Sequence, residues 1–429
     1  MANSFTRVAK EVFSNRNILS IAVTTSIISL CDMGWRPFWS LYLKNDLGAT
    51  ITVVGLLSTI ASSERLLFQL PGGLLADRYG RRKIIVYGTA LRILPPIIYI
   101  FASHWTHVIP ALLISGAASI YMPAFNAIIA DSMPKSERGA GFGAYRTITA
   151  IPQIFSPIIG GIVMDSMGYK EGIRIFFIIS FFGTILVTYI RWKVITETLV
   201  QSSAPKQVQQ AAPKRTLKQR IGETFDLPRT VWVLVVVAIL GSFGMRMVWE
   251  FMSIYAVEIV GLSNTELGLV QTTGGVIAMV LAMPGGMLSD RFGRKPLILL
   301  SRIISPLMTY AITLVTGFEQ YYLVSIVSSI GNALGGGGMW AGGPAWNALI
   351  ADLVPPEKRG TVMGTIGTLT GIVATPSSLM GGYLWQAYSP QMPYYISLVL
   401  GVIGTAVFAI WVKEPKRSGE VQTQESQAD

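Results

Sequence analysis

The sequence predicts an all-α membrane protein with twelve transmembrane helices in two pseudo-symmetric six-helix bundles. The first observation is composition: charged residues make up 13% and apolar residues 51% of the 429-residue chain, whereas soluble domains carry about 25% charged residues. The second is an internal repeat that divides the chain into two similar halves. The third is the placement of lysine and arginine, which concentrate on one side of the predicted membrane.

Apolar runs of about 20 residues, the length that crosses a bilayer, mark the predicted helices in chain order. These runs cover residues 18–43, 51–75, 84–103, 107–131, 140–165, 173–194, 229–258, 263–288, 296–316, 320–352, 360–386 and 391–413. The leading segment MANSFTRVAKEVFSNRN has no apolar core, so we expect the first helix to be retained and not cleaved as a signal peptide. Cys31 is the only cysteine, which excludes a disulfide within the chain.

The basic residues predict the topology. The net charge is +11, and when connections are assigned alternately to the two sides, the side opposite the termini holds only Lys44, Lys170 and Arg174. The positive-inside rule then places both termini in the cytoplasm. We expect a monomeric multi-pass protein of the plasma membrane, in contact with the lipid bilayer.

A basic, polar segment separates the two halves. The expected units are an N-terminal bundle (1–195), a cytoplasmic linker (196–228), a C-terminal bundle (229–413) and a polar cytoplasmic tail (414–429). The linker is expected to lie near anionic lipid headgroups. It lacks the interleaved aromatic residues that favour nucleic-acid binding, so no nucleic-acid partner is expected.

The two halves repeat short motifs. PGGLLADRYGRR (Pro71–Arg82) recurs as PGGMLSDRFGRK (Pro284–Lys295), an offset of 213 residues from 71 to 284. PAFNAIIAD (Pro123–Asp131) recurs as PAWNALIAD (Pro344–Asp352), an offset of 221 residues from 123 to 344. Agreement of this length indicates a duplication of six helices.

The first repeated motif resembles the loop 2–3 and loop 8–9 motif of the major facilitator superfamily, and the chain resembles its twelve-helix drug:proton antiporter branch. The matching residues are Gly73, Asp77, Arg78, Gly80 and Arg81 in the first copy, and Gly286, Asp290, Arg291, Gly293 and Arg294 in the second. The resemblance implies a central cavity that opens alternately to each side, lined mainly by the first, fourth, seventh and tenth helices. It also implies a conformational gate, in which Asp77 faces the positive end of the helix that starts near Gly360. Arg78 and Arg81 also fit a purely topological role.

The fifth predicted helix contains PQIFSPIIGGIVMD, and its candidate motif residues are Pro152, Pro157, Gly160 and Gly161. The pattern resembles the proline–glycine motif of family antiporters, although Ser156 stands where that motif has glycine. The alternative is a kinked, closely packed helix. In the fourth helix Leu112 occupies the place of an arginine that many of these antiporters carry, so proton coupling here must use other residues.

The tenth predicted helix contains GNALGGGGMWAGGP, with four consecutive glycines from Gly335 to Gly338. Because glycine weakens a helix by about 1 kcal/mol relative to alanine, we expect a flexible functional segment. Tight helix packing is the alternative.

Ionisable and aromatic residues within the predicted helices are the candidate site. We expect Asp32, Glu250 and Glu64 to couple protons, and Arg36, Arg246, Trp35, Tyr121, Trp249 and Trp340 to line the substrate cavity. Asp32 and Arg36 are four residues apart, as are Arg246 and Glu250, so each pair is expected to share a helix face. The alternative is a set of static ion pairs. Arg92 and Arg302, on helices expected at the periphery, are expected to snorkel towards the membrane surface.

The sequence therefore predicts a secondary active transporter that works by alternating access, with proton-coupled export of small amphipathic molecules. The alternative is proton-coupled uptake of a small organic anion or a sugar. A passive channel or a membrane enzyme is less consistent with the chain, because it has no Gly-Lys-Ser/Thr phosphate loop, and His104 and His107 have no nucleophile beside them. No catalytic residue, metal or cofactor is predicted.

Overall fold

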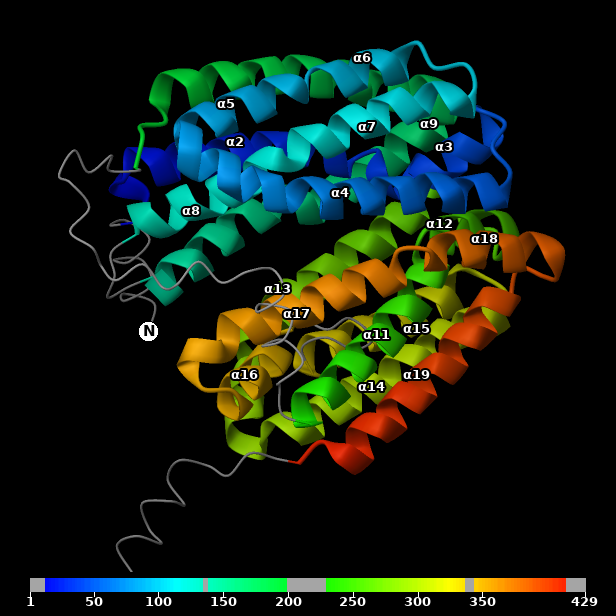
Figure 1. Cartoon of the computed structure of the whole chain (residues 1–429). Helices are drawn as coiled ribbons and strands as arrows, with labels where there is room; N and C mark the ends of the chain where they lie inside the picture. Colours follow the sequence, from blue (N-terminus) through cyan, green and yellow to red (C-terminus); the bar gives the residue numbers. More distant parts are fainter. Residues whose placement is uncertain (1–11, 134–137, 199–228, 336–342, 414–429) are drawn as a thin grey trace, which may run out of the picture.

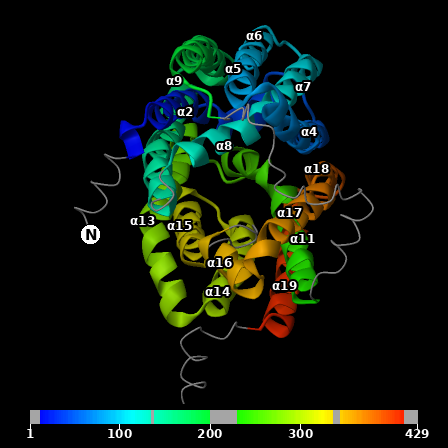
Figure 2. The ribbon, with the colours of Figure 1, turned by 60° about the vertical axis from the view of Figure 1, so that its left-hand side comes forward.

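The computed structural model of the chain describes residues 12–133, 138–198, 229–335 and 343–413. These residues form helices joined by short connections, arranged as two bundles that lie against each other (Figures 1 and 2). The N-terminal half contains α2 (Arg16–Met33), η1 (Arg36–Phe38), α3 (Trp39–Asn45), α4 (Ile51–Tyr79), α5 (Arg81–Leu91), α6 (Leu94–Ile100), η2 (Trp105–His107), α7 (Val108–Ala118), η3 (Ser119–Tyr121), α8 (Met122–Ser132) and α9 (Arg138–Val194).

The C-terminal half follows the same plan. It contains α11 (Arg229–Trp249), α12 (Met252–Ile254), η4 (Tyr255–Ile259), α13 (Asn264–Phe292), α14 (Arg294–Ala311), η5 (Ile312–Leu314), α15 (Phe318–Gly335), α16 (Pro344–Leu353), α17 (Pro356–Ala374), α18 (Ser377–Ala387) and α19 (Met392–Trp411). Several crossings are built from two or three shorter helices, because proline and glycine interrupt them.

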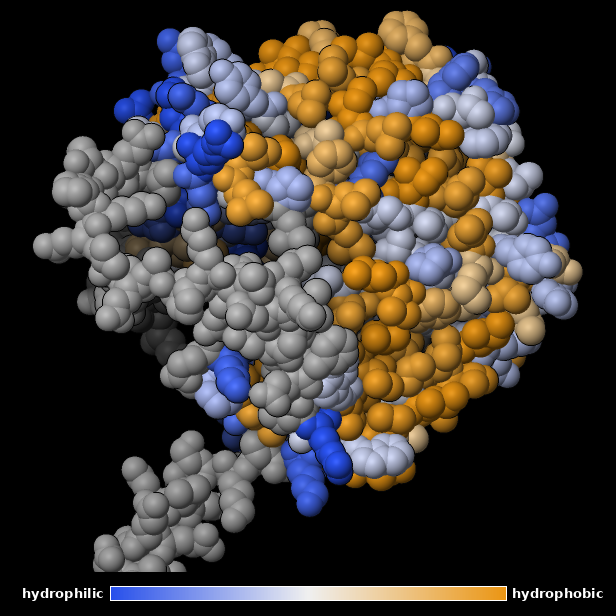
Figure 3. Space-filling view, in the orientation of Figure 1, coloured by the Kyte–Doolittle hydropathy of each residue, from blue (hydrophilic) through white to orange (hydrophobic). Residues whose placement is uncertain are grey.

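Among the described residues, nine helical stretches are long and apolar enough to cross a membrane. The longest, 141–194, holds two helices that meet at Gly168, where φ is +77°. Apolar side chains cover much of the outer surface along the helices (Figure 3), as expected for helices that face lipid. The fold is the predicted one: an all-α membrane protein whose twelve helices form two bundles.

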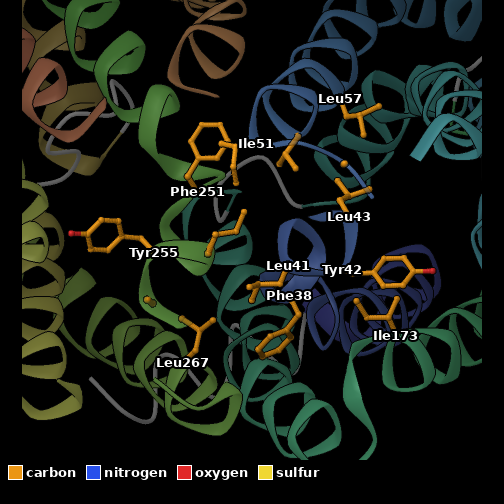
Figure 4. Packing of buried hydrophobic residues seen from close by; sticks show 14 of the residues in the cluster. Phe38, Leu41, Tyr42, Leu43, Ile51, Leu57, Ile173, Phe251, Tyr255 and Leu267 are labelled. Carbon is orange, nitrogen blue, oxygen red and sulfur yellow. The ribbon is translucent and has the colours of Figure 1, made fainter. Parts of the chain in front are cut away.

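Among the described residues, the contacts between the two halves extend from one end to the middle of the molecule. The terminus side is the end of the molecule where the described chain begins and ends. The far side is the end with the α3–α4 connection (Figure 1). One buried apolar cluster joins both halves at the far side and includes Phe38 and Leu41 of one half and Phe251 and Leu267 of the other (Figure 4). The other two buried clusters each belong to a single half and lie towards the terminus side. The surface is hollowed between the halves at the terminus side (left in Figure 3).

Glycines bring the backbones of the two halves close together. A Cβ atom on Gly161 would lie 2.3 Å from the carbonyl oxygen of Asn264, and one on Gly268 would lie 2.5 Å from that of Pro157. The duplication repeats these contacts at the 213 and 221 offsets. The repeated contacts are Gly382 with the carbonyl of Ile51 (2.6 Å) and Gly55 with the carbonyl of Ser378 (2.3 Å).

Gly160 forms the closest approach within the N-terminal half, and it yields a test of the packing. A Cβ there would lie 1.7 Å from the carbonyl oxygen of Gly34, whereas a Cβ on Gly143 of the same helix meets no atom of the described residues within 4 Å. Gly160→Ala should therefore force α2 and α9 apart and cost about 1–3 kcal/mol. Thermal unfolding in detergent should show a lower Tm for Gly160→Ala and an equal or higher Tm for Gly143→Ala, because alanine favours the helix. Equal melting temperatures for Gly160→Ala and the wild type would contradict this packing.

Candidate functional site

Charged side chains cross the boundary between the halves near the middle of the molecule. The Nη1 of Arg246 in α11 donates to the hydroxyl of Ser62 in α4 at 3.2 Å. The carboxylate of Glu250 lies beside Ser58 of α4, within electrostatic range of Arg36 and Arg246. These residues come from α4, α11 and the breaks that follow α2 and α11, so this cluster bridges the two halves.

Asp32 belongs to a different group, inside the N-terminal half. Its Oδ2 accepts from the Nη2 of Arg92 at 2.6 Å, and its Oδ1 accepts from the hydroxyl of Ser180 at 3.3 Å. The side chains of Arg92 and Asp32 are 30% and 22% exposed, so this ion pair is neither sealed nor fully solvated. Arg92 also donates to the hydroxyl of Tyr121 at 3.3 Å.

The pairing expected between Asp32 and Arg36 is therefore wrong. Residues four apart share a face only in a continuous helix. Here α2 ends at Met33, and the short η1 turn begins at Arg36, so the helix is broken between Asp32 and Arg36. Arg36 is exposed and lies within electrostatic range of Glu250 in the other half.

Arg92 and Arg302 do not snorkel as expected. Arg92 lies at the break between α5 and α6, where it turns into the bundle towards Asp32. The signal for this break was in the sequence, because Pro95 and Pro96 follow three and four residues later. Arg302 is 2% exposed and donates to the carbonyl oxygen of Val237 at 3.1 Å.

Tyr121 packs beneath two guanidinium groups. It is 5% exposed, and besides Arg92 it contacts Arg191, whose Cζ lies 5.5 Å from its ring centroid. Arg191 is 1% exposed and donates to the hydroxyls of Thr24 (3.2 Å) and Thr89 (2.8 Å). Tyr121 thus contributes to the packing and polar contacts of the N-terminal half.

The tryptophans expected in the cavity have different surroundings. Trp35 packs edge-on against Trp39 and Phe177, with ring centroids 5.4 and 5.2 Å away. Trp249 at the end of α11 is 49% exposed. Trp340 and residues 336–338 of the glycine run lie outside the described residues.

Glu64 is 5% exposed in the middle of α4. Its side chain packs against Gly116 of α7, where an added Cβ would lie 2.4 Å from the Glu64 carboxylate. Among the described residues, its Oε1 has no hydrogen-bond partner. Because Gly116 has no side chain, the carboxyl group of Glu64 fits against α7.

The two copies of the repeated loop motif lie at the terminus side. Arg81 pairs with Asp131 at the end of α8, and the Nε of Arg294 lies 3.3 Å from Asp352 at the equivalent place in α16. Arg294 also pairs with Asp290 of its own motif. Each motif arginine therefore ties its loop to the end of the fourth crossing of its own half.

The glycines of the repeated loop motif differ in their structural roles. Gly80 and Gly293 adopt φ values of +95° and +99° at the α4–α5 and α13–α14 turns, a conformation that glycine accepts most readily. Within the described part of the chain, an added Cβ on Gly73 would be 3.9 Å from the nearest atom, and one on Gly286 would meet nothing within 4 Å. The tight contact is made instead by the preceding residue, Gly72, whose added Cβ would lie 2.3 Å from the carbonyl oxygen of Ile120.

The other motif residues are oriented by their loops. Asp77 is exposed at the end of α4. The guanidinium groups of Arg78 and Arg291 each lie over the neighbouring aromatic ring, at 5.3 Å from Tyr79 and 5.5 Å from Phe292.

The proline–glycine motif of α9 faces two neighbours. Gly160 approaches α2 in its own half, whereas Gly161 and the carbonyl of Pro157 contact α13 of the other half. The carbonyl of Pro152, one turn earlier, accepts from the hydroxyl of Ser156. The motif therefore lies at the main contact between the halves.

A small cavity of about 80 Å³ lies at the far side, within the N-terminal half. Burial raises the pKa of its Asp46 carboxyl group, while Lys170 and Arg174 act in the opposite direction. The cavity lies apart from the charged cluster between the halves. Its lining residues are Tyr42, Asp46, Leu47, Ala102, Ser103, Lys170 and Arg174.

Comparison with known proteins places this geometry in a family. Residues 21–263 and 234–428 match the family described as Major Facilitator Superfamily. The uncharacterized MFS-type transporter MJ1560 of Methanocaldococcus jannaschii is 22% identical over 394 residues, which are 90% of this chain and 96% of that protein. The quinolone resistance protein NorA of Staphylococcus aureus is 22% identical over 379 residues, which are 87% of this chain and 91% of that protein. A crystal structure of a bacterial homolog of the human lysosomal transporter Spinster, inward-facing and unoccupied, superposes with a TM-score of 0.70, 16% identity and coverage of 94% and 96%.

The Asp32–Arg92 pair predicts a specific stability pattern. Arg92→Gln should leave Asp32 without its cation and, because both groups are partly exposed, cost about 1–3 kcal/mol. Asp32→Asn combined with Arg92→Gln should recover most of this loss. Arg36→Gln is the matched control, and it should change the stability by less than about 0.5 kcal/mol because Arg36 is exposed. Thermal unfolding of the four proteins measures these effects, and a larger loss in Arg36→Gln than in Arg92→Gln would refute the assignment.

Proposed function

The chain belongs to the Major Facilitator Superfamily, and we propose that it works by alternating access as a proton-coupled exporter of small amphipathic molecules. Membership makes it a multi-pass membrane transporter of a small molecule and not an enzyme. The coupling ion, the direction of transport and the class of cargo are the proposal.

The single observation that carries proton coupling is the Asp32–Arg92 ion pair. A carboxylate within a membrane-spanning bundle is costly unless it is paired or reached by water, and such groups mark proton and substrate pathways. Here the partner comes from another helix at 2.6 Å and both groups remain partly exposed. Protonation of Asp32 would cancel the attraction and free Arg92, so a proton could exchange with a rearrangement of the bundle. Leu112 of α7 stands where many antiporters of the family have an arginine, and Arg92 provides a cation from another helix instead.

Glu250, Arg36 and Arg246 are proposed to contact the cargo and to transmit its binding between the halves. They lie where the halves meet near the middle of the molecule. Exposed Trp249 at the same level offers an aromatic surface that suits an amphipathic molecule. Glu64 is a second candidate for proton binding. The similarity to NorA, a quinolone resistance protein, supports export of such molecules, as does the antiporter-like motif of α9.

We propose that the terminus side faces the cytoplasm of a plasma-membrane protein that acts as a monomer, since the basic residues concentrate there. The structure is then open to the cytoplasm and closed to the outside, the state in which an exporter loads its cargo. In the opposite state, Asp77 is proposed to meet the positive N-terminal end of α17 and Asp290 that of α9. Arg81 and Arg294 would keep these loops in place through Asp131 and Asp352.

Proteoliposomes test the coupling with ethidium as the amphipathic probe and an imposed pH gradient. Asp32→Asn keeps the size of the side chain but cannot titrate, so gradient-driven ethidium movement should fall at least about 100-fold, the scale of a lost proton-transfer group. Glu171→Gln is the control, because this exposed carboxylate pairs with Arg174 at the far side.

Two outcomes would contradict the proposal. Gradient-driven transport at the wild-type rate in Asp32→Asn combined with Arg92→Gln, after normalisation for folded protein, would show that the pair is structural. If transport by the wild-type protein did not depend on the pH gradient, proton coupling would be rejected. If the wild-type protein did not transport ethidium, the proposed class of cargo would be rejected.

A further inference from the structure

One carboxylate joins the two halves at the far side through four hydrogen bonds. Asp165, near the end of the first arm of α9, reaches the first turn of α13. Its Oδ1 accepts from the backbone N–H (3.0 Å) and the side-chain amide (2.9 Å) of Asn264. Its Oδ2 accepts from the backbone N–H (2.7 Å) and the hydroxyl (2.5 Å) of Thr265.

The duplication places a second contact of the same kind on the other edge of the boundary. Gln386 is the counterpart of Asp165 at the 221 offset (165 to 386), and Thr52 is the counterpart of Thr265 at the 213 offset (52 to 265). The Oε1 of Gln386 accepts from the hydroxyl of Thr52 at 2.8 Å and from its backbone N–H at 3.4 Å. The first turn of α4 is thus held by a neutral amide, and the first turn of α13 by a charged carboxylate.

We infer that Asp165 and Gln386 are the positioning residues of the far-side gate, with Asp165 as the stronger lock and Gln386 as its weaker counterpart. This inference rests on the alternating access proposed above, because the far side must open in each cycle and both contacts must then break. Hydrogen bonds to an ionised group are about twice as strong as neutral ones. A carboxylate is also favoured at the positive N-terminal end of a helix.

Neither helix needs the contact in order to begin. Ser263 accepts from the backbone N–H of Glu266 at 3.1 Å, and Glu266 accepts from the backbone N–H of Ser263 at 2.8 Å, so α13 has its own capping box. Thr50 caps α4 in a similar way by accepting from the backbone N–H of Val53 at 3.3 Å. The free energy of the Asp165 contact therefore acts mainly on the closure of the two halves.

One helical turn before each contact, a glycine brings the backbones of the two halves close together in the same way. Gly161 lies one turn before Asp165 and touches α13, and Gly382 lies one turn before Gln386 and touches α4. Lys44 and Glu258 form a further ion pair between the halves at this end. The two contacts thus stand at equivalent helix ends. They differ in the charge of Asp165 and in Asn264, whose counterpart Ile51 has no side-chain donor.

Labelling of a buried cysteine measures the opening. Ser378 is 4% exposed, and its hydroxyl lies 3.4 Å from that of Ser58 across the boundary, so Ser378→Cys is a nearly isosteric reporter. A membrane-impermeant maleimide, added from the far side of proteoliposomes without cargo, should react at a rate proportional to the open population. The chain without Ser378→Cys gives the background from Cys31, which is 7% exposed.

In the reporter background, Asp165→Asn should raise the labelling rate about tenfold, because it removes the charge and turns one acceptor into a donor. Adding Gln386→Glu should reverse most of this increase, since it places a carboxylate at the equivalent first turn of α4. Glu171→Gln, which removes a far-side carboxylate that pairs within its own half, should leave the rate unchanged. Thr265→Ala, which removes only the hydroxyl donor, should raise the rate by a smaller factor and serves if Asp165→Asn folds poorly.

Equal rates for Asp165→Asn, Thr265→Ala and the wild-type reporter would overturn the inference, as would an increase on adding Gln386→Glu. Because the assay contains no cargo and no pH gradient, its result is independent of the ethidium experiment. Failure of ethidium transport with the expected labelling pattern would reject the proposed cargo and retain the gate.

Discussion

The arrangement of the molecule depends on the approach of backbone to backbone at the boundary between the halves. In lipid, apolar burial gives little drive for helices to associate, so close packing of small residues has to supply it. Gly161 and Gly268 let α9 and α13 come so near that a Cβ on either would lie within about 2.5 Å of a carbonyl oxygen. The duplication repeats this contact between α4 and α18. The two contacts bring the polar groups of the far side within hydrogen-bonding distance and leave the terminus side apart.

This constraint divides the intramembrane charges into two kinds. Asp32 and Arg92 lie within one half, so a rigid-body movement of the halves leaves their distance unchanged. Arg246 donates to Ser62 across the boundary, and Glu250 lies beside Ser58 across it, so the same movement must break or reform these contacts. A proton on Asp32 can therefore influence the movement only through a rearrangement inside the N-terminal half. Arg92 is the residue best placed to transmit it, because it contacts both Asp32 and Tyr121.

Hydropathy and the internal repeat were sufficient to predict twelve helices in two bundles, because both follow from the thickness of the bilayer and from an unbroken pattern along the chain. The side-chain pairs were less predictable. The four-residue rule for Asp32 and Arg36 assumes a continuous helix, and the break after Met33 changes which way each side chain points. The same limit applies to Gly73, since sequence alone does not tell which of two adjacent glycines faces the neighbouring helix. The roles of Asp165 and Gln386 required the three-dimensional pairing of the halves.

The buried arginines show how a duplication can keep a physical feature and lose its sequence signal. Arg191 lies over Phe125 with its Cζ 5.0 Å from the ring centroid, and Arg302 lies over Trp346, the counterpart of Phe125, at 6.0 Å. At the 213 offset, however, Arg302 is the counterpart of Thr89, and at the 221 offset of the later motif Arg191 is the counterpart of Val412. The guanidinium group therefore reaches the same place from a different helix in each half. An alignment of the halves pairs each arginine with a residue of another kind, although both halves retain a buried cation against an aromatic ring.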